Sequence, residues 1–232
     1  MIKRFTIYTL LVTLMQAMLS LGSMAAEASA GSFACEFSGA ANFAASRFFV
    51  DDMQEERNAT LNTYGGDLSF LYTLDKNNSL LVRLGYAGGT AGASIVDSWV
   101  GGSDMHFFDY ELNTFYLMLG NRYTVSLSGK AAFFCGVNVG AINHSIKSKT
   151  SSLYSAGEYK ETHEYAEHAS EWGVVCAVEA GFIVDLSENS YLMAAYQFSA
   201  STSAPEIGSG EGSISSDFQS YNSIRLGVGY RF

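Results

Sequence analysis

The sequence predicts an all-β fold: an eight-stranded antiparallel up-and-down transmembrane β-barrel that follows a cleaved signal peptide. Large apolar residues alternate with small or polar ones along eight segments, and a β-strand has a side-chain period of two. Short turns alternate with longer polar segments between these strands, as in up-and-down membrane barrels. Charged residues make up only 16% of the 232 residues, well below the roughly 25% of an average soluble domain.

Residues 1–30 have the composition of a secretory signal peptide, and residues 31–232 are expected to form the barrel. Lys3 and Arg4 precede an apolar run, and small residues offer cleavage sites after Ala25, Ala28 or Ala30. Removing residues 1–30 takes away two positive charges and one negative charge, so the formal net charge of −10 becomes −11. This acidity argues against nucleic-acid binding, which requires a basic surface.

The first three strands are expected at residues 33–45, 62–74 and 80–93, each with one apolar face. A polar loop is expected at 46–60, and turn-forming residues fill 75–79. Small residues and isolated charges occupy the opposite face. The residues expected on the apolar face are Phe33, Cys35, Phe37, Phe43, Tyr64, Leu68, Phe70, Tyr72, Leu80, Val82, Leu84 and Tyr86.

Strands four and five are expected at residues 107–123 and 131–145, joined by a short turn at 126–129. Polar loops are expected before them, at 94–106, and after them, at 147–170. In strand four the acidic residues lie at odd positions, so they are assigned to the face opposite the apolar one. The residues expected on the apolar face are Phe108, Tyr110, Leu112, Tyr116, Met118, Phe133, Cys135, Val137 and Val139.

The last three strands are expected at residues 171–186, 191–201 and 221–232. A short turn at 187–190 and a polar loop at 201–219 connect them. The final strand ends the sequence on an aromatic residue. The residues expected on the apolar face are Trp172, Val174, Cys176, Val178, Ala180, Phe182, Val184, Leu192, Ala194, Tyr196, Phe198, Ile224, Leu226, Val228, Tyr230 and Phe232.

The apolar face is expected to contact lipid, although periodicity alone does not distinguish lipid from a protein core. The opposite face consists mainly of Gly, Ala, Ser and Asn, which suit the narrow interior of an eight-stranded barrel. Aromatic residues gather near the strand ends, as in the interfacial girdles of membrane barrels. These aromatic residues are Tyr72, Tyr86, Phe108, Trp172, Phe198, Tyr230 and Phe232.

Two stretches resemble small outer-membrane barrels. The terminal LGVGYRF resembles the C-terminal signal that outer-membrane proteins present to the barrel-assembly machinery. Residues 172–198 resemble strand six, the following turn and strand seven of eight-stranded OmpA-type and opacity-type barrels. The resemblance implies a bacterial outer-membrane location, and an assembly signal formed by Leu226, Val228, Tyr230 and Phe232.

Charged and amide side chains on the expected lumen face form the candidate site. Unpaired charges in a water-poor lumen are costly, so Arg83 and Arg225 are expected to pair with carboxylates. Counting back from the turn at 187–190 places Glu179 opposite Gln197. A structural network that fills the lumen is favoured over a gated pore lining or a catalytic acid–base set. The predicted network is Asp67, Arg83, Glu111, Glu179, Gln197 and Arg225.

No catalytic or metal-binding motif is recognised. His144 and Ser145 are neighbours and therefore point to opposite faces of a strand, which does not give a nucleophile–base pair. His163 and His168 lie five residues apart, whereas the zincin helix requires a spacing of four. The odd number of cysteines is not a disulfide framework. We expect no enzymatic activity, no cofactor and no metal.

The favoured function is a structural or adhesin-like role through the extracellular loops 46–60, 94–106, 147–170 and 201–219. A narrow channel for small or apolar solutes is the alternative, and a lipid-modifying outer-membrane enzyme is the third. The expected partners are outer-membrane lipid and lipopolysaccharide, the barrel-assembly machinery and an extracellular ligand bound by the loops.

Overall fold

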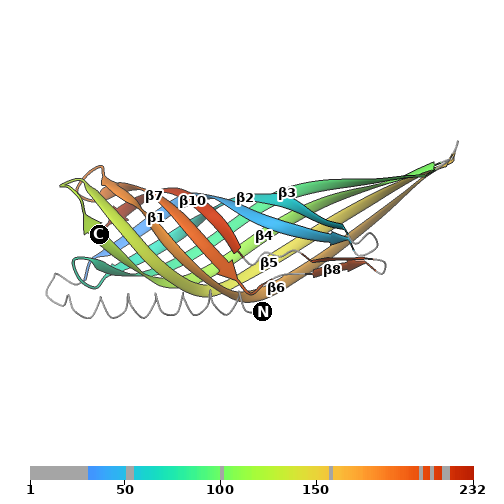
Figure 1. Cartoon of the computed structure of the whole chain (residues 1–232). Coiled ribbons are helices and arrows are strands. Elements are labelled where there is room, and N and C mark those ends of the chain that lie inside the picture. Colours follow the sequence, from blue (N-terminus) through green and yellow to red (C-terminus); the bar gives the residue numbers. More distant parts are fainter. Residues whose placement is uncertain are drawn as a thin grey trace.

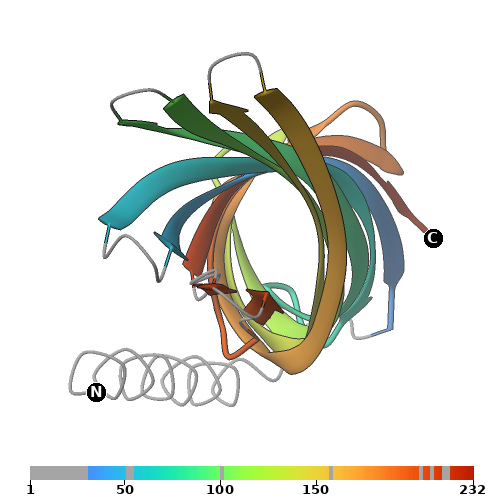
Figure 2. The same ribbon diagram turned by 90° about the vertical axis from the view of Figure 1, so that its right-hand side faces the viewer.

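In the computed structural model, eight strands close into one antiparallel barrel with the order β1-β10-β7-β6-β5-β4-β3-β2 (Figures 1 and 2). A separate two-stranded hairpin is formed by β8 and β9. The strands are β1 (Phe33–Val50), β2 (Glu55–Thr73), β3 (Asn78–Trp99), β4 (Gly102–Ser126), β5 (Ala131–Ala156), β6 (Tyr159–Asp185), β7 (Ser190–Ser201), β8 (Glu206–Ser209), β9 (Gly212–Ser215) and β10 (Ser220–Arg231).

The predicted signal peptide lies outside the residues that the structure describes. Within the described part, no helix is long and apolar enough to cross a membrane. For several strands the side chains are described over only part of the length, and the side chain of Phe108, predicted to point outward, lies outside the described part. The described residues are 31–50, 55–99, 102–156, 159–203, 206–209, 212–215 and 220–232.

The last strand closes the barrel by pairing with the first. β10 pairs with β1 from Ala34↔Arg231 to Ala44↔Tyr221, and it pairs with β7 on its other side. The main-chain N–H of Phe232 donates to the carbonyl oxygen of Phe33 at 2.8 Å. Closure pairs the backbone groups that would otherwise form sheet edges, which a lipid environment requires.

An apolar band covers the outside of the barrel. In β10, alternate residues from Ile224 to Phe232 point outward and are between 48% and 77% exposed. β2, β3, β6 and β7 follow the predicted alternation in the same way. Exposed apolar side chains on these four strands include Tyr64, Phe70, Leu80, Val82, Leu84, Tyr86, Trp172, Val174, Phe182, Val184, Leu192 and Tyr196.

The three short turns are observed where they were predicted, at one end of the barrel, which is also the end where the chain terminates (Figure 1). In the first turn, the main-chain N–H groups of Asn77 and Asn78 donate to Asp75 Oδ1 at 2.8 and 2.9 Å. The Asn78 side chain donates to Asp75 Oδ2 at 2.8 Å. Burial raises the pKa of the Asp75 carboxyl, but these hydrogen bonds and Lys76 outweigh it, so the pKa is lowered overall.

The predicted loops at 94–106 and 147–170 are wrong, because most of these residues continue the strands. β3 pairs with β4 up to Trp99↔Gly102, and β5 pairs with β6 up to Ala156↔Tyr159. Residues predicted as a loop at 46–60 likewise extend β1 and β2, which pair up to Val50↔Glu55. Outside a membrane both faces of a sheet meet water, so polar composition there does not distinguish a loop from a strand.

The four strands β3–β6 therefore form a sheet that runs far past the barrel, toward the right in Figure 1. We call this sheet the extension; it comprises residues 89–99, 102–112, 146–156 and 159–169. The region predicted as a loop at 201–219 contains the short β8–β9 hairpin. The short turns of bacterial membrane barrels face the periplasm. The extension is at the end opposite these turns, which corresponds to the extracellular side.

The faces of β4 are the reverse of the prediction. Tyr110, Leu112, Tyr116 and Met118 are buried inside the barrel, whereas the odd-numbered positions, including Glu111, face outward. Within the apolar band these odd positions are occupied by Phe115, Leu117 and Leu119, which are 40–59% exposed. Asp109 and Glu111 misled the assignment because they lie on the same outward face but at its extracellular end, beyond the apolar band.

Large inward residues of β4 and β7 fit because glycines face them on the neighbouring strands. Tyr116 is the register partner of Gly85, and Tyr191 is the partner of Gly229. A Cβ atom at Gly85 would lie 2.1 Å from Tyr116 Cζ, and one at Gly229 would lie 2.1 Å from Tyr191 Cζ. Each tyrosine thus occupies space that a side chain opposite it would fill.

Candidate functional site

A layer of charged and amide side chains crosses the middle of the lumen. Seven strands of the barrel contribute one residue each, and every residue is at most 4% exposed. The layer contains three arginines and three carboxylates, so its formal charge is zero. We call it the polar layer; it consists of Glu36, Asp67, Arg83, Arg122, Glu179, Gln197 and Arg225.

Glu179 on β6 is the centre of the polar layer because it contacts all three arginines. Its Oε2 atom accepts from Arg83 Nη2 and from Arg225 Nη1, both at 2.9 Å. Its Oε1 atom accepts from Arg122 Nη2 at 3.4 Å. Gln197, the register partner of Glu179 on β7, accepts from Arg83 Nη1 at 2.8 Å.

Arg225 and Arg83 are held from the opposite side by β1 and β2. Arg225 Nε donates to Asp67 Oδ2 at 3.0 Å, and a second Arg225 nitrogen contacts the other Asp67 oxygen. Arg225 Nη2 also donates to Ser38 Oγ at 2.8 Å. Arg83 Nε donates to Ser69 Oγ at 3.0 Å. Bidentate pairing of this kind fixes orientation as well as charge.

Arg122 on β4 forms a second pair closer to the periplasmic end. Its two terminal nitrogens donate to the two Glu36 oxygens at 2.5 and 3.0 Å. Tyr191 donates its hydroxyl to Glu36 Oε1 at 2.8 Å, and the Arg122 guanidinium lies 4.2 Å from the centre of the Phe134 ring. A vestibule of about 200 Å³ at the periplasmic mouth is lined by Arg122, Tyr191 and Arg231 among others.

Two apolar clusters pack inside the barrel. One is formed by residues of the extracellular half, including Tyr116, Met118 and Ile142, with Met118 and Ile142 fully buried. The other lies toward the short turns and includes Phe134 and Met193. In the described part of the barrel, apolar clusters therefore lie on either side of the ion-paired layer, as expected for the narrow interior of eight strands.

The structure brings together five of the six residues predicted for this network: Asp67, Arg83, Glu179, Gln197 and Arg225. Glu111 is not part of it, which corrects the prediction. Its side chain is 52% exposed on the outer wall, where Glu111 Oε2 lies 3.9 Å from Lys147 Nζ.

Sequence reasoning missed Arg122 and left Glu36 out of the predicted network. Arg122 is an even-numbered position of β4, and the even-numbered positions of this strand were predicted to face lipid. An arginine so near the apolar band is itself a signal, because a charge on the lipid face is destabilising. Placing Arg122 inside would have corrected the faces of β4.

The polar layer can hold the strands together and close the lumen. Every carboxylate in it is bound to at least one arginine. Among the residues described, no group of three or more His, Cys, Asp or Glu side chains could hold a metal. Cys35, Cys135 and Cys176 are free thiols.

A serine–histidine contact lies on the outer wall, and the sequence did not suggest it. Ser145 Oγ on β5 lies 3.0 Å from His168 Nε2 on β6. His144 takes no part in this contact. As predicted, it points to the opposite face from Ser145: it lies inside the barrel, where its ring contacts Thr114 Oγ1 at 2.9 Å. In the described part of the chain, no hydrogen bond joins a carboxylate to His168.

An apolar outer band around a closed eight-stranded barrel with buried ion pairs defines an outer-membrane-type β-barrel. No known sequence family and no curated protein matches the chain. Solved structures similar to it include the outer membrane protein OprG from Pseudomonas aeruginosa, at 14% identity and a TM-score of 0.48, covering 90% of this chain and 99% of OprG.

Two further similar structures are also small barrels. Neisserial surface protein A is 12% identical with a TM-score of 0.44, covering 87% of this chain and 97% of that protein. Ail, the attachment invasion locus protein of Yersinia pestis, is 15% identical with a TM-score of 0.42, covering 88% of this chain and 100% of Ail. Similarities this distant carry no information on function.

Proposed function

We propose that this protein is a non-enzymatic barrel of the bacterial outer membrane that uses the extension for contact with partners outside the cell. The class of partner that fits is a polypeptide segment able to add a strand to an exposed sheet edge. Main-chain hydrogen bonds supply the affinity in such complexes, and side chains select the partner. The observation that carries the proposal is that β3 and β6, the outer strands of the extension, each have a partner strand on one side only.

β3 loses its partner on one side long before it ends. β2 pairs with β3 only as far as Tyr64↔Gly88, while β3 continues to Trp99. On the other side of the extension, β6 begins at Tyr159 but pairs with β7 only from Val175. In the described residues both outer strands of the extension therefore have an edge without a ladder partner, which is a template for pairing with another chain.

The filled lumen supports this function over the alternative of a channel. An ion or solute crossing the barrel would have to displace the Arg122–Glu36 pair and then the three contacts of Glu179. Opening a buried ion pair leaves an uncompensated charge and costs about 3–5 kcal/mol.

An adhesion assay with edge variants tests the proposal. The full chain is displayed on a non-adherent bacterium, and binding to cultured epithelial cells and immobilised matrix proteins is counted. Ile95→Lys together with Val96→Lys adds charge to the edge strand β3, and edge lysines block strand addition. We expect adhesion to fall several-fold relative to the unmodified chain.

The matched control places the same two charges on the inner strand. Met105 and His106 are the register partners of Val96 and Ile95 on β4, which is paired on both sides. Met105→Lys with His106→Lys should leave adhesion close to that of the unmodified chain. Equal adhesion by the edge variant and the unmodified chain, at equal surface display, would refute strand addition at the β3 edge.

A lipid-modifying enzyme is a second candidate, supported only by the Ser145–His168 contact on the outer wall. A serine activated by a histidine can take part in acyl transfer. Mass spectra of lipid A from cells overexpressing the chain and its Ser145→Ala variant decide this question. We expect identical spectra, whereas an acyl change that depends on Ser145 would establish the enzyme.

A further inference from the structure

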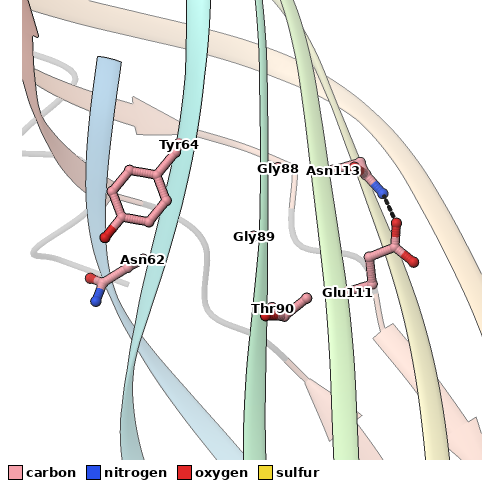
Figure 3. A pocket seen from close by; sticks show the side chains of 7 residues that line it. All are labelled: Asn62, Tyr64, Gly88, Gly89, Thr90, Glu111 and Asn113. Carbon is pink, nitrogen blue, oxygen red and sulfur yellow. Dashed lines mark hydrogen bonds between the residues drawn. The ribbon is translucent and has the colours of Figure 1, made fainter. Parts of the chain in front are cut away.

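A groove of about 550 Å³ opens on the outer wall of the barrel where β2 and β3 separate (Figure 3). Asn62 and Tyr64 of β2 lie on one side of it, and Glu111 and Asn113 of β4 lie on the other. The volume is within the range of small-molecule sites, about 300–1,000 Å³. The groove is separate from the polar layer, and it adjoins the start of the free β3 edge, with which it shares Gly89 and Thr90.

A missing side chain keeps the centre of the groove open. Tyr64, Gly88 and Asn113 are register partners across three strands, so their outward positions lie side by side. Gly88 leaves bare backbone between the Tyr64 ring, which is 64% exposed, and the Asn113 amide. A Cβ atom at Gly88 would lie 3.1 Å from Asn113 Oδ1, so any larger residue would crowd the floor.

The polar wall of the groove is already oriented. Tyr86 donates its hydroxyl to Asn113 Oδ1 at 2.5 Å, and Asn113 Nδ2 donates to Glu111 Oε1 at 3.2 Å. The amide nitrogen of an asparagine carries two hydrogens, and a carboxylate accepts several hydrogen bonds. The wall therefore offers one donor and several acceptors to a ligand that carries hydroxyl groups.

The charges around the groove disfavour an anionic group inside it. Glu111 lines the groove, and Lys147 Nζ lies 3.9 Å from Glu111 Oε2. Lys149 is the register partner of Asp109, so each lysine on this wall sits opposite a carboxylate. The Glu111 carboxylate would repel a phosphate or sulfate in the groove, because no surplus of positive charge offsets it. A neutral hydroxyl group would not be repelled.

The groove lies at the level of the lipid headgroups. Tyr64 and Tyr72 bound a nine-residue span of β2, which is the length that crosses the apolar core in a tilted strand, about 9–11 residues. Phe115 and Trp172 add a T-shaped aromatic pair on the extracellular side, with ring centres 6.3 Å apart. Such aromatic girdles mark the membrane interface.

We propose that this groove binds an uncharged pyranose ring of a glycolipid headgroup in the outer leaflet, with the phosphates of that headgroup outside the groove. The apolar C–H face of the sugar packs on the Tyr64 ring. Its hydroxyls donate to the Glu111 carboxylate and accept from the free N–H of Asn113. A soluble glycan presents the same chemistry, so the experiment separates the two sources.

Binding is measured by titrating the full chain in detergent micelles with rough lipopolysaccharide and, separately, with the soluble glucosamine disaccharide of its headgroup. Tyr64→Ala should weaken lipopolysaccharide binding about tenfold, since loss of one aromatic contact is worth about one power of ten. Asn113→Ala removes the amide of the polar wall, leaves Glu111 in place, and tests the same site independently. Gel migration of the unboiled protein verifies that each variant is folded.

Tyr72→Ala is the matched control. Tyr72 lies on the same strand, also points outward, and belongs to the opposite girdle, where its ring lies 4.9 Å from that of Phe33. This variant should bind lipopolysaccharide within about twofold of the unmodified chain, well inside the tenfold effect expected at Tyr64.

Three outcomes are distinguished. Lipopolysaccharide binding that depends on Tyr64 and Asn113, without binding of the disaccharide, supports the glycolipid. Binding of the disaccharide with the same dependence and affinity supports the sugar site but overturns the membrane glycolipid as its source. Binding that is unaffected by both variants, or equally affected by Tyr72→Ala, overturns the proposal.

Discussion

Glu179→Gln is the substitution that most sharply probes the polar layer. The change keeps the shape of the side chain but leaves three buried arginines facing two carboxylates. Glu179 oxygens lie 2.9 Å from Arg83 and Arg225 and 3.4 Å from Arg122. Removing one partner of a buried ion pair costs about 3–5 kcal/mol, which lowers the folded-to-unfolded ratio by roughly 150- to 4,000-fold.

The assay is urea unfolding of the barrel in lipid vesicles, followed by tryptophan emission and by gel migration of unboiled samples. Glu111→Gln is the matched control, because this carboxylate is half exposed and 3.9 Å from Lys147. Surface ion pairs contribute about 0–1 kcal/mol, so the control should stay within that range. A Glu179→Gln barrel as stable as the control would refute the claim that the polar layer holds the strands together.

Three further outcomes follow from local geometry. Gly85→Ala should cost about 1–3 kcal/mol through overpacking against Tyr116, whereas Gly129→Ala, with no atom within 4 Å of the added Cβ, should be neutral in the same urea assay. Asp75→Ala should cost about 1–2 kcal/mol at pH 7 through the lost turn hydrogen bonds. Folding lowers the pKa of Asp75, so the ionised carboxylate stabilises the folded state. The stability difference between the unmodified chain and Asp75→Ala should therefore shrink as pH falls below about 4 and the carboxylate becomes protonated. Proteolysis of the Asp75→Ala variant should show no new cleavage in the extension, which lies at the other end of the barrel.

The strand number, the short turns and most faces could be predicted because a membrane imposes a strong alternation. Ile224, Leu226 and Val228 must be apolar where they meet lipid, and the residues between them must fit a narrow interior. The pairing of Glu179 with Gln197 could also be predicted, since a short turn fixes the register of the two strands it joins.

The reversed faces of β4 could not be predicted from its own composition. Inside a small barrel, Tyr116 and Met118 are as suitable as small residues when a glycine such as Gly85 faces them. Outside the membrane, Glu111 is suitable on either face. Only the partner strands decide between these arrangements, and they are far away in sequence.

The extension could not be predicted for a related reason. Its backbone pairing continues after the alternation of apolar and polar residues has ended, as at Lys147↔His168. Hydrogen bonds between main-chain groups stabilise such a ladder whatever the side chains are. Polar composition was therefore mistaken for a loop. Lys147 and His168 lie opposite each other on the paired strands β5 and β6, not in a loop.

Ion conductance in planar bilayers tests most directly whether the lumen is filled. The purified full chain is reconstituted at low density, and currents are recorded over a range of voltages. With the polar layer and both apolar clusters in place, we predict no steady unitary currents. Steady, reproducible single-channel steps from the unmodified chain would contradict a barrel closed by the Glu179 contacts and the Arg122–Glu36 pair.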